Sequence, residues 1–270
     1  MTGVRTELDG PVAVLTLDGP EKLNAFSART ASALGAAYAA CDADDRIRAV
    51  VLTGEGRAFC AGADMSPAAD AFAARDREFS ASPVDPPAWR VRKPVLAAVN
   101  GHAIGIGLTI ALQCDLRLVA EDAKLAIPQV RRGMVGDAQS HHTLRQLVGM
   151  ATAADLLLTG RTITGAEAAR RGIATEALPA AEVLAATLAL AHEVAEQASP
   201  AALALSKQIL WSGADLEHTE QLETRAHHVL MAHPDAQEGP RAWHERRVPL
   251  WTLRVSDLPE RWDAGDGDAP

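Results

Sequence analysis

The chain has 270 residues, of which 48% are hydrophobic and 23% are charged, and its net charge is −9. This composition is typical of a globular enzyme or binding protein with a sizeable core, and the negative charge argues against general binding to nucleic acid or to an anionic membrane surface. The three cysteines are widely spaced, which predicts neither a disulfide framework nor a zinc site. No segment resembles a secretion signal or a membrane span, so we expect a cytoplasmic protein without a bound metal.

The first half of the chain alternates between predicted strands and helices. Strands are expected at residues 4–8, 11–17, 48–53, 95–99, 114–120 and 124–127, with helices from Ser27 to about residue 41 and from about residue 108. Asp9-Gly10 favours a tight turn between the first two strands, and Ser27 is a suitable helix N-cap. The alternation predicts an α/β fold built from βαβ units.

The second half of the chain has helical periodicity. Helices are expected at residues 144–158, 165–171, 180–197, 200–211, 215–231 and 235–246. Between the two halves, residues 66–88 predict a helix followed by an irregular segment, because three prolines gather near its end. Residues 263–270 predict a frayed tail.

Two loops rich in small residues follow buried strands. One spans residues 58–65, and in the other Gly101, Gly105 and Gly107 precede an apolar helix. Glycine allows close approach of a ligand or of a second backbone, and the free N–H groups at a helix start suit an oxygen that becomes negative. Two such loops at the carboxyl ends of strands predict two convergent donors, an oxyanion hole. The competing interpretation is that these residues serve tight packing alone.

With these motifs the sequence resembles the crotonase, or enoyl-CoA hydratase/isomerase, superfamily. The matching stretches, in order, are residues 23–25, 50–54, 59–64, 93–101, 105–107, 114–115, 147–149, 158–160, 166–168 and 238–239. The resemblance implies an α/β fold with a crotonase-like spiral core of ββα units over residues 1–199 and a C-terminal helical trimerisation region over residues 200–270. It also implies an acyl-CoA thioester as substrate, no further cofactor, and a homotrimer or a dimer of trimers.

The resemblance assigns roles to particular positions. The backbone N–H groups of Ala63 and Ile106 correspond to the family's oxyanion donors, which stabilise a thioester enolate. Residues expected to line the CoA and substrate side are Lys22, Leu23, Ala25, Ala61, Asp64, Met65, Gly105 and Gln129. Lys22 could equally be a solvated charge rather than a phosphate ligand, and Asp64 could simply cap a helix.

The acid and base groups depart from the hydratase pattern. Thr109 and Gln129 stand where hydratases carry glutamates, and neither can exchange a proton at neutral pH. Asp137 falls where single-acid relatives carry their carboxylate, among them Δ3,Δ2-enoyl-CoA isomerases and 4-chlorobenzoyl-CoA dehalogenase. His141, four residues later, could hydrogen-bond Asp137 or act as a second acid or base. A structural alternative is that Asp137 only caps the following helix.

We therefore expect an acyl-CoA enzyme of lipid or carboxylic-acid metabolism with isomerase-like chemistry, because an isomerase needs only one carboxylate. Three alternatives remain at this stage. A hydratase could use Asp137 and His141 in place of the glutamates. A dehalogenase-like nucleophile at Asp137 lacks a histidine beside the aromatic Trp89. Finally, Thr109 and Gln129 are compatible with a non-catalytic acyl-CoA binding protein.

Overall fold

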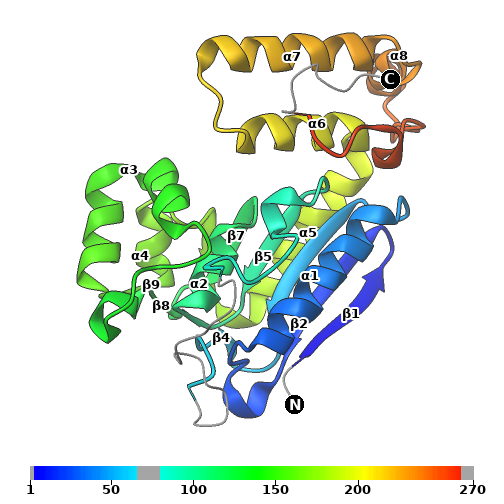
Figure 1. The fold of residues 1–270 in the computed structure, drawn as a ribbon. Coiled ribbons are helices and arrows are strands. Elements are labelled where there is room, and N and C mark those ends of the chain that lie inside the picture. The colour runs from blue at the N-terminus through cyan, green and yellow to red at the C-terminus, as the bar shows by residue number, and fades with distance from the viewer. Residues whose placement is uncertain (1–2, 66–79, 263–270) are drawn as a thin grey trace.

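A large, mostly parallel sheet forms the centre of the molecule (Figure 1). The computed structural model describes residues 3–65 and 80–262. The sheet has the order β1 (Gly3–Asp9), β2 (Val12–Asp18), β3 (Ala49–Gly54), β5 (Val95–Val99), β7 (Leu116–Ala120) and β10 (Glu176–Leu178). β1 and β2 form the expected antiparallel hairpin, and the other neighbours are parallel. β3 and β5 are buried along their whole length, which explains their continuous apolar runs.

A second, smaller sheet explains how the core spirals. It has the order β4 (Ala58–Cys60), β6 (His102–Ile104), β8 (Lys124–Ala126) and β9 (Thr162–Thr164). From β3 to β8 successive strands therefore alternate between the sheets: β5 lies in the large one and β6 in the small one, followed by α2 (Ile106–Leu112). β7 and β8 repeat the pattern ahead of η3 (Pro128–Arg132) and α3 (Ser140–Thr159). These are the ββα units that the resemblance implied.

Simple βαβ units were therefore the wrong expectation for this half of the chain. β4 and β6 lie in segments expected to be loop and turn, and β9 and β10 were also missed. Each of these strands is three residues long. Such a strand is too short to show the two-residue alternation on which strand prediction depends.

Helices cover the sheet as the periodicity predicts. α1 (Ala28–Ala43) begins at Ser27, whose side chain accepts a hydrogen bond from the Thr30 N–H in a capping box. α4 (Gly165–Arg170) precedes β10, and α5 (Ala180–Gln197) packs against β3, β5 and β7. Among the helices of the described residues, none combines the length and the apolar character needed to cross a membrane. The predicted segment 66–79 and the tail 263–270 lie outside the described residues.

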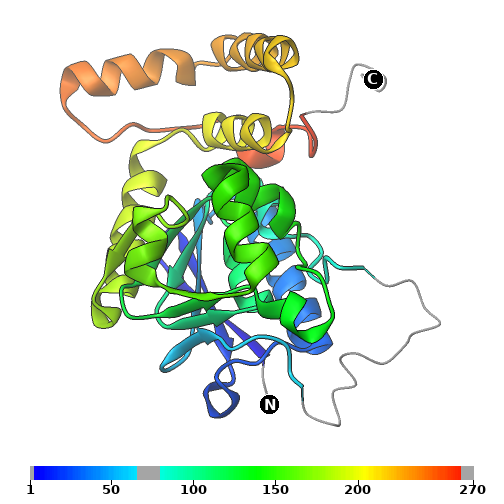
Figure 2. The ribbon, with the colours of Figure 1, turned by 90° about the vertical axis from the view of Figure 1, so that its left-hand side faces the viewer.

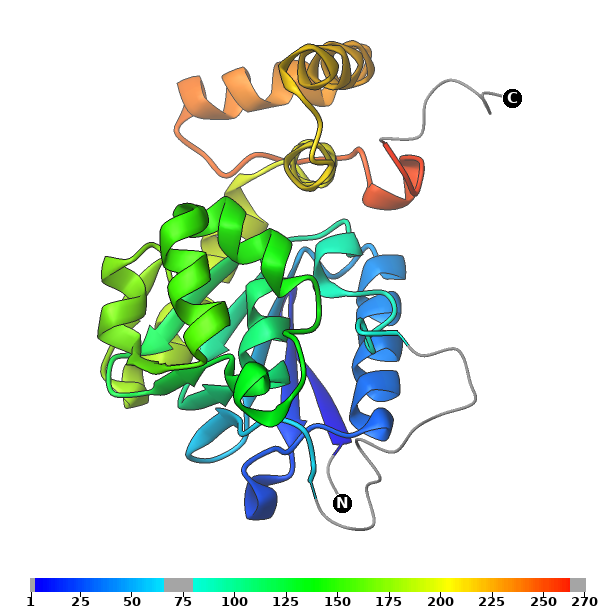
Figure 3. The ribbon, with the colours of Figure 1, turned by 60° about the vertical axis from the view of Figure 1, so that its left-hand side comes forward.

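The last three helices form a separate layer above the core, seen from two further sides in Figures 2 and 3. They are α6 (Pro200–Trp211), α7 (Leu216–Met231) and α8 (Asp235–Glu245), within about a residue of the predicted bounds. One buried hydrophobic cluster runs from Val12 to Ala195, and a second runs from Ala201 to Trp262. The two clusters support a division near residue 199, but that division and the role of this layer in trimer formation stay predictions.

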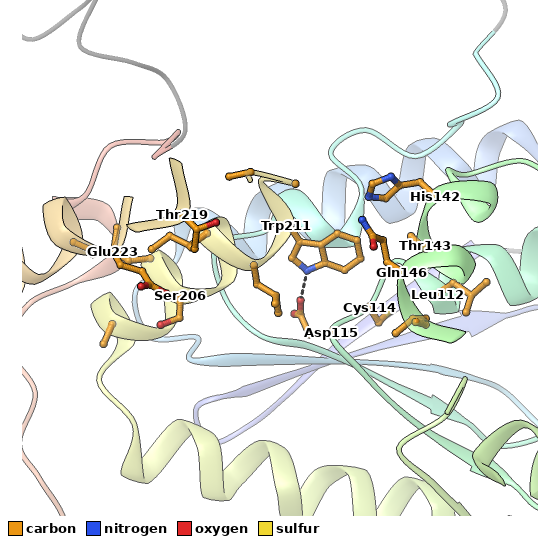
Figure 4. Close-up of a pocket in the computed structure, with 18 of the residues that line it drawn as sticks. Leu112, Cys114, Asp115, His142, Thr143, Gln146, Ser206, Trp211, Thr219 and Glu223 are labelled. Atoms are coloured by element: carbon orange, nitrogen blue, oxygen red, sulfur yellow. Dashed lines mark hydrogen bonds between the residues drawn. The ribbon is translucent and has the colours of Figure 1, made fainter. Parts of the chain in front are cut away.

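A buried ion pair fastens this layer to the core. Lys207 Nζ on α6 lies 2.7 Å from Asp115 Oδ2, and it also donates to the backbone carbonyls of Ala88 and Lys93 at 2.9 Å. Trp211 Nε1 donates to the other oxygen of Asp115 at 2.8 Å. Figure 4 shows this contact at the wall of a cleft of about 870 Å³ between the core and the C-terminal helices.

Replacing Lys207 with methionine is expected to destabilise the protein by about 3–5 kcal/mol, because it removes one partner of a largely buried ion pair and leaves the Asp115 carboxylate without it. Urea unfolding of the variant measures the loss. Lys124→Met, at an exposed lysine on β8, is the matched control and should lose less than about 1 kcal/mol. Similar losses for the two variants would contradict a stabilising role for the buried pair.

Candidate active site

Three glycine positions bring the two small-residue loops into contact. β4 pairs with β6 in parallel, so the loops that follow these strands leave the same edge of the small sheet. A Cβ atom on Gly62 would lie 3.0 Å from the Ile104 carbonyl oxygen. A Cβ atom on Gly107 would lie 2.3 Å from the Cys60 carbonyl oxygen, and one on Gly101 would lie 2.2 Å from that of Arg57. Tight packing is therefore a real function of these glycines, and it also brings the start of α2 against the loop that carries Ala63.

The N–H groups of Ala63 and Ile106 are not used by the strand bridge and the helix to which they belong. Phe26 donates to the Gly62 carbonyl at 2.8 Å and accepts from the Asp64 N–H at 2.9 Å, which forms a parallel bridge between Phe26 and Ala63. In such a bridge the N–H of the central residue points away from the partner strand. Ile106 is the first residue of α2, so its N–H has no acceptor within the helix. These directions suit two oxyanion donors, a role that stays a prediction.

Gly105 turns the chain into α2. Its φ of 56° and ψ of −123° are unfavourable for residues with a side chain, and its N–H donates to the Ala126 carbonyl on β8 at 2.8 Å. A Cβ atom at this position would meet the amide group of Gln129 at 3.5–3.9 Å. The Gln129 side chain therefore packs against Gly105, the residue directly before Ile106.

Asp137 lies next to the same helix start. Thr109 Oγ1 donates to its Oδ1 at 2.5 Å, and Gln129 Nε2 donates to its Oδ2 at 3.3 Å. The two residues that replace the hydratase glutamates thus both bind the one carboxylate that the sequence singled out. Burial raises the pKa of Asp137 above the usual range of an aspartate, while the two donated hydrogen bonds act in the opposite direction.

The helix-capping alternative for Asp137 is wrong. α3 begins at Ser140 with Gln139 as its N-cap, and no side chain caps its first turn. Ala138 and Gln139 have φ angles of 45° and 54°, which are uncommon for residues other than glycine. Strained backbone of this kind persists only where the surroundings hold it, and it gathers at functional sites.

Gln113, at the end of α2, holds this strained turn and was not singled out from the sequence. Its Nε2 donates to Gln139 Oε1 at 2.6 Å and to the Ala138 carbonyl at 3.3 Å. The Ala138 N–H donates to the Ala81 carbonyl at 2.8 Å. A buried glutamine on a helix gives no sequence signal that distinguishes it from a packing residue, so only the structure identifies its role.

The expected hydrogen bond between His141 and Asp137 is wrong. The four-residue spacing places two side chains on one helix face only when both belong to the helix, and Asp137 precedes α3 across the two left-handed residues. His141 is exposed, and with Arg145 and Met150 it lines a separate groove of about 450 Å³ along α3. Its position lends no support to a role as a second acid or base.

The residues expected to bind CoA form one surface beside Ala63. Ala61 donates through its N–H to the Leu23 carbonyl at 2.9 Å, and Ala25 donates to the Lys22 carbonyl at 3.2 Å. Lys22 Nζ lies 3.1 Å from Asp64 Oδ2, so a phosphate group would compete with this carboxylate for the lysine. Met65 is 56% exposed at the end of the same loop. The structure brings these residues together, and their binding roles stay predictions.

Asn24 is a further residue that the sequence reasoning did not assign. Its buried side chain accepts from the Gly19 N–H at 2.9 Å and donates to the Ala58 carbonyl at 2.8 Å. Leu23 and Asn24 both adopt left-handed φ angles, of 53° and 56°. The Asn24 side chain thus fixes the turn that carries Lys22 and Leu23 against β4.

Cys60 is a further ionisable group close to Asp137. Burial raises the pKa of its thiol to about 12, with a smaller contribution from the negative charge of Asp137. The thiol is therefore neutral at physiological pH and supplies no nucleophilic thiolate. Within residues 3–65 and 80–262, no three His, Cys, Asp or Glu side chains converge as metal ligands.

The two alternating sheets, the ββα repeats and the C-terminal helical layer define a crotonase-type fold. Residues 7–254 match the family model described as enoyl-CoA hydratase/isomerase. The crystal structure of a probable enoyl-CoA hydratase/isomerase from Mycobacterium abscessus superposes with a TM-score of 0.90 at 47% identity, covering 93% of this chain and 99% of that one.

Two curated relatives agree with this assignment. A probable enoyl-CoA hydratase from Mycobacterium tuberculosis is 34% identical over 259 residues, which are 93% of this chain and 98% of the relative. A carnitinyl-CoA dehydratase from Salmonella arizonae is 34% identical over 257 residues, with coverages of 92% and 97%. The chain belongs to the enoyl-CoA hydratase/isomerase family, and is an enzyme of that family acting on acyl-CoA.

Proposed function

We propose that this enzyme moves a double bond along an acyl-CoA thioester, converting a 3-enoyl-CoA into a 2-enoyl-CoA with Asp137 as the acid–base group. The observation that carries the proposal is the convergence of Thr109 and Gln129 on Asp137. In hydratases these two positions hold carboxylates. In this chain they hold Thr109 and Gln129, which both hydrogen-bond to the single carboxylate of Asp137. Isomerisation needs one group that accepts and returns a proton, whereas hydration by the usual route needs two.

The reaction begins with binding of the thioester carbonyl oxygen to the N–H groups of Ala63 and Ile106. The Asp137 carboxylate takes the proton from C2, and the electron pair of the broken C–H bond enters a dienolate whose negative charge rests on the thioester oxygen. Two fixed N–H donors stabilise that charge without reorganising. Asp137 then returns the proton to C4, which leaves the double bond between C2 and C3 and restores the carboxylate.

The elevated pKa of Asp137 favours this chemistry. A base works best when its pKa approaches the operating pH, and burial moves the carboxylate in that direction. The reaction requires the ionised form, so its rate should fall as the pH drops through the pKa of Asp137.

Hydration of a 2-enoyl-CoA is the second candidate, because the Mycobacterium tuberculosis relative is named a hydratase and the Salmonella arizonae relative a dehydratase. In that case Asp137 would act alone on both the water and the α carbon, since the structure shows no hydrogen bond or ion pair between His141 and Asp137. The substrate's chain length and branching are left open by this proposal.

Supplying the purified enzyme with 3-enoyl-CoA and 2-enoyl-CoA thioesters of several chain lengths tests the proposal. The expected result is formation of 2-enoyl-CoA from the 3-enoyl substrate, with deuterium placed at C2 of the substrate transferred to C4 of the product, because Asp137 returns the proton that it has taken. Formation of 3-hydroxyacyl-CoA without isomerisation would instead support hydration. Tight binding without any product across the panel would support the acyl-CoA binding alternative.

Three further expectations accompany this proposal: a homotrimer or a dimer of trimers, a cytoplasmic location, and coenzyme A entering only as part of the substrate. Light scattering of the purified enzyme addresses the first of these. A monomer would contradict it.

A further inference from the structure

The Thr109 hydroxyl has two acceptors and one proton. Its Oγ1 lies 2.5 Å from Asp137 Oδ1 and 3.3 Å from the backbone carbonyl of Ile106, and the side chain is fully buried. A hydroxyl can donate one hydrogen bond while accepting others. With Asp137 ionised, the proton of Thr109 must point to the carboxylate, because the shorter contact needs a proton between the two oxygens.

The same hydroxyl can serve a protonated Asp137. If Oδ1 carries the proton, it donates to Thr109 Oγ1, and the Thr109 hydroxyl turns its own proton to the Ile106 carbonyl. Both states then have complete hydrogen bonds, with no movement of heavy atoms. Valine at this position would have the same shape but would offer neither interaction.

Gln129 has a matching property on the other side of the carboxylate. Its Nε2 donates to Asp137 Oδ2, while its Oε1 is buried and has no hydrogen-bond partner within the described residues. A buried acceptor without a donor is costly and calls for an explanation. Rotating the amide by 180° exchanges its nitrogen and oxygen, so that Oε1 would accept from a protonated Oδ2.

We propose that Thr109 and Gln129 are positioning residues that hold Asp137 through both halves of its proton transfer by reversing the direction of their hydrogen bonds. When the carboxylate is ionised, both residues donate to it. When it carries the substrate's proton, one of them accepts that proton's hydrogen bond while the carboxyl group keeps its place between Thr109 and Gln129. This inference deepens the proposed function and rests on Asp137 being its acid–base group.

Burial has the largest effect on the pKa of Asp137, and the hydrogen bonds from these two residues oppose it. They contribute from α2 and η3, and the group that faces Asp137 from β4 is the neutral thiol of Cys60. On the α3 side, exposed His141 packs against Gly136, with its ring about 3.3 Å from where a Cβ of Gly136 would lie. No cation among the described residues pairs with Asp137. Removal of a donor should therefore act directly on its titration.

The test compares Thr109→Val with Thr109→Ser by two measurements. Carbon-13 NMR of labelled aspartate, with the Asp137 signal assigned by its absence in Asp137→Asn, follows ionisation without substrate. The pH profile of kcat/KM follows the same group during turnover. Because valine removes a donor to the charged form, Asp137 should titrate about 1 pH unit higher in Thr109→Val, with the acidic limb of the profile shifted equally. Thr109→Ser keeps the donor and should titrate as the wild type does.

Gln129→Met provides a second variant at a less buried position. It should raise the titration of Asp137 by a smaller amount, because the lost hydrogen bond is longer. An Asp137 signal that titrates as in the wild type in folded Thr109→Val and in Gln129→Met would overturn the inference. If Asp137 titrates higher in both variants but Asp137→Asn is still active, the positioning role is upheld and Asp137 is refuted as the catalytic group. Failure of the positioning role can thus be distinguished from failure of the proposed function.

Discussion

Asp137→Asn is expected to lower turnover of 3-enoyl-CoA by about 100- to 10,000-fold, the usual contribution of a positioned acid–base group. Asparagine has the same size, so Thr109 can still donate to its side-chain oxygen and the strained turn at Ala138 should persist. What is lost is the ability to accept the C2 proton, because an amide cannot take it at neutral pH. The oxyanion donors remain, so binding of the thioester should change little and the loss should appear in kcat.

Steady-state kinetics at saturating substrate measure this effect, and calorimetric titration of a non-reactive acyl-CoA measures binding. Asp122→Asn, at an exposed aspartate in the turn before β8, is the matched control and should keep wild-type turnover. Turnover by Asp137→Asn at the wild-type rate would remove Asp137 from the mechanism. A large loss of binding with unchanged kcat would indicate that Asp137 holds the substrate rather than moving a proton.

Much of the fold was predictable because its elements carry strong local signals. The α1 start follows from Ser27, and the α6 bounds follow from a helical period opened by Pro200 and capped by Ser199. In the second sheet, the short strands β4, β6 and β9 carry no such period. β4 and β6 form because their neighbours in space complete the ladder, and that information lies in residues far along the chain.

In the active site, too, some features were predictable from the sequence and others were not. The small residues of the two loops predicted close backbone approach, which the structure shows, whereas the assignment of Ala63 and Ile106 as oxyanion donors came from the resemblance to the family and stays a prediction. The convergence of Thr109 and Gln129 on Asp137 could not be predicted, since it depends on how α2, η3 and the turn before α3 meet in space. His141 shows the opposite error. A spacing rule valid within a helix was applied across a helix start, and the left-handed φ angles of Ala138 and Gln139 lie between the two residues.

Gly107→Ala is expected to lower turnover by about 100- to 1000-fold, the cost of losing one oxyanion donor. The new Cβ atom would stand 2.3 Å from the Cys60 carbonyl oxygen and 2.8 Å from the Cys60 Cβ. Both atoms belong to or adjoin the backbone of β4, so the start of α2 must move away. Ile106 precedes Gly107 directly, and its N–H would move with the helix while Ala63 stays with the loop after β4. A donor pair that no longer converges stabilises the enolate less.

Loss of stability must be separated from loss of the donor. Gly165→Ala is the matched control, because its Cβ atom would stand 2.0 Å from the Ala120 carbonyl oxygen in a contact between α4 and β7. Both variants should unfold at lower temperature, but only Gly107→Ala should lose kcat when rates are expressed per folded enzyme. If Gly107→Ala does not fold, Gly62→Ala replaces it in the test. Its new Cβ atom would make a milder contact of 3.0 Å with the Ile104 carbonyl oxygen, at a residue with a φ of 104°. Folded variants at both positions with wild-type kcat would contradict an oxyanion hole at this junction, because each substitution separates the loops that are proposed to share the substrate oxygen.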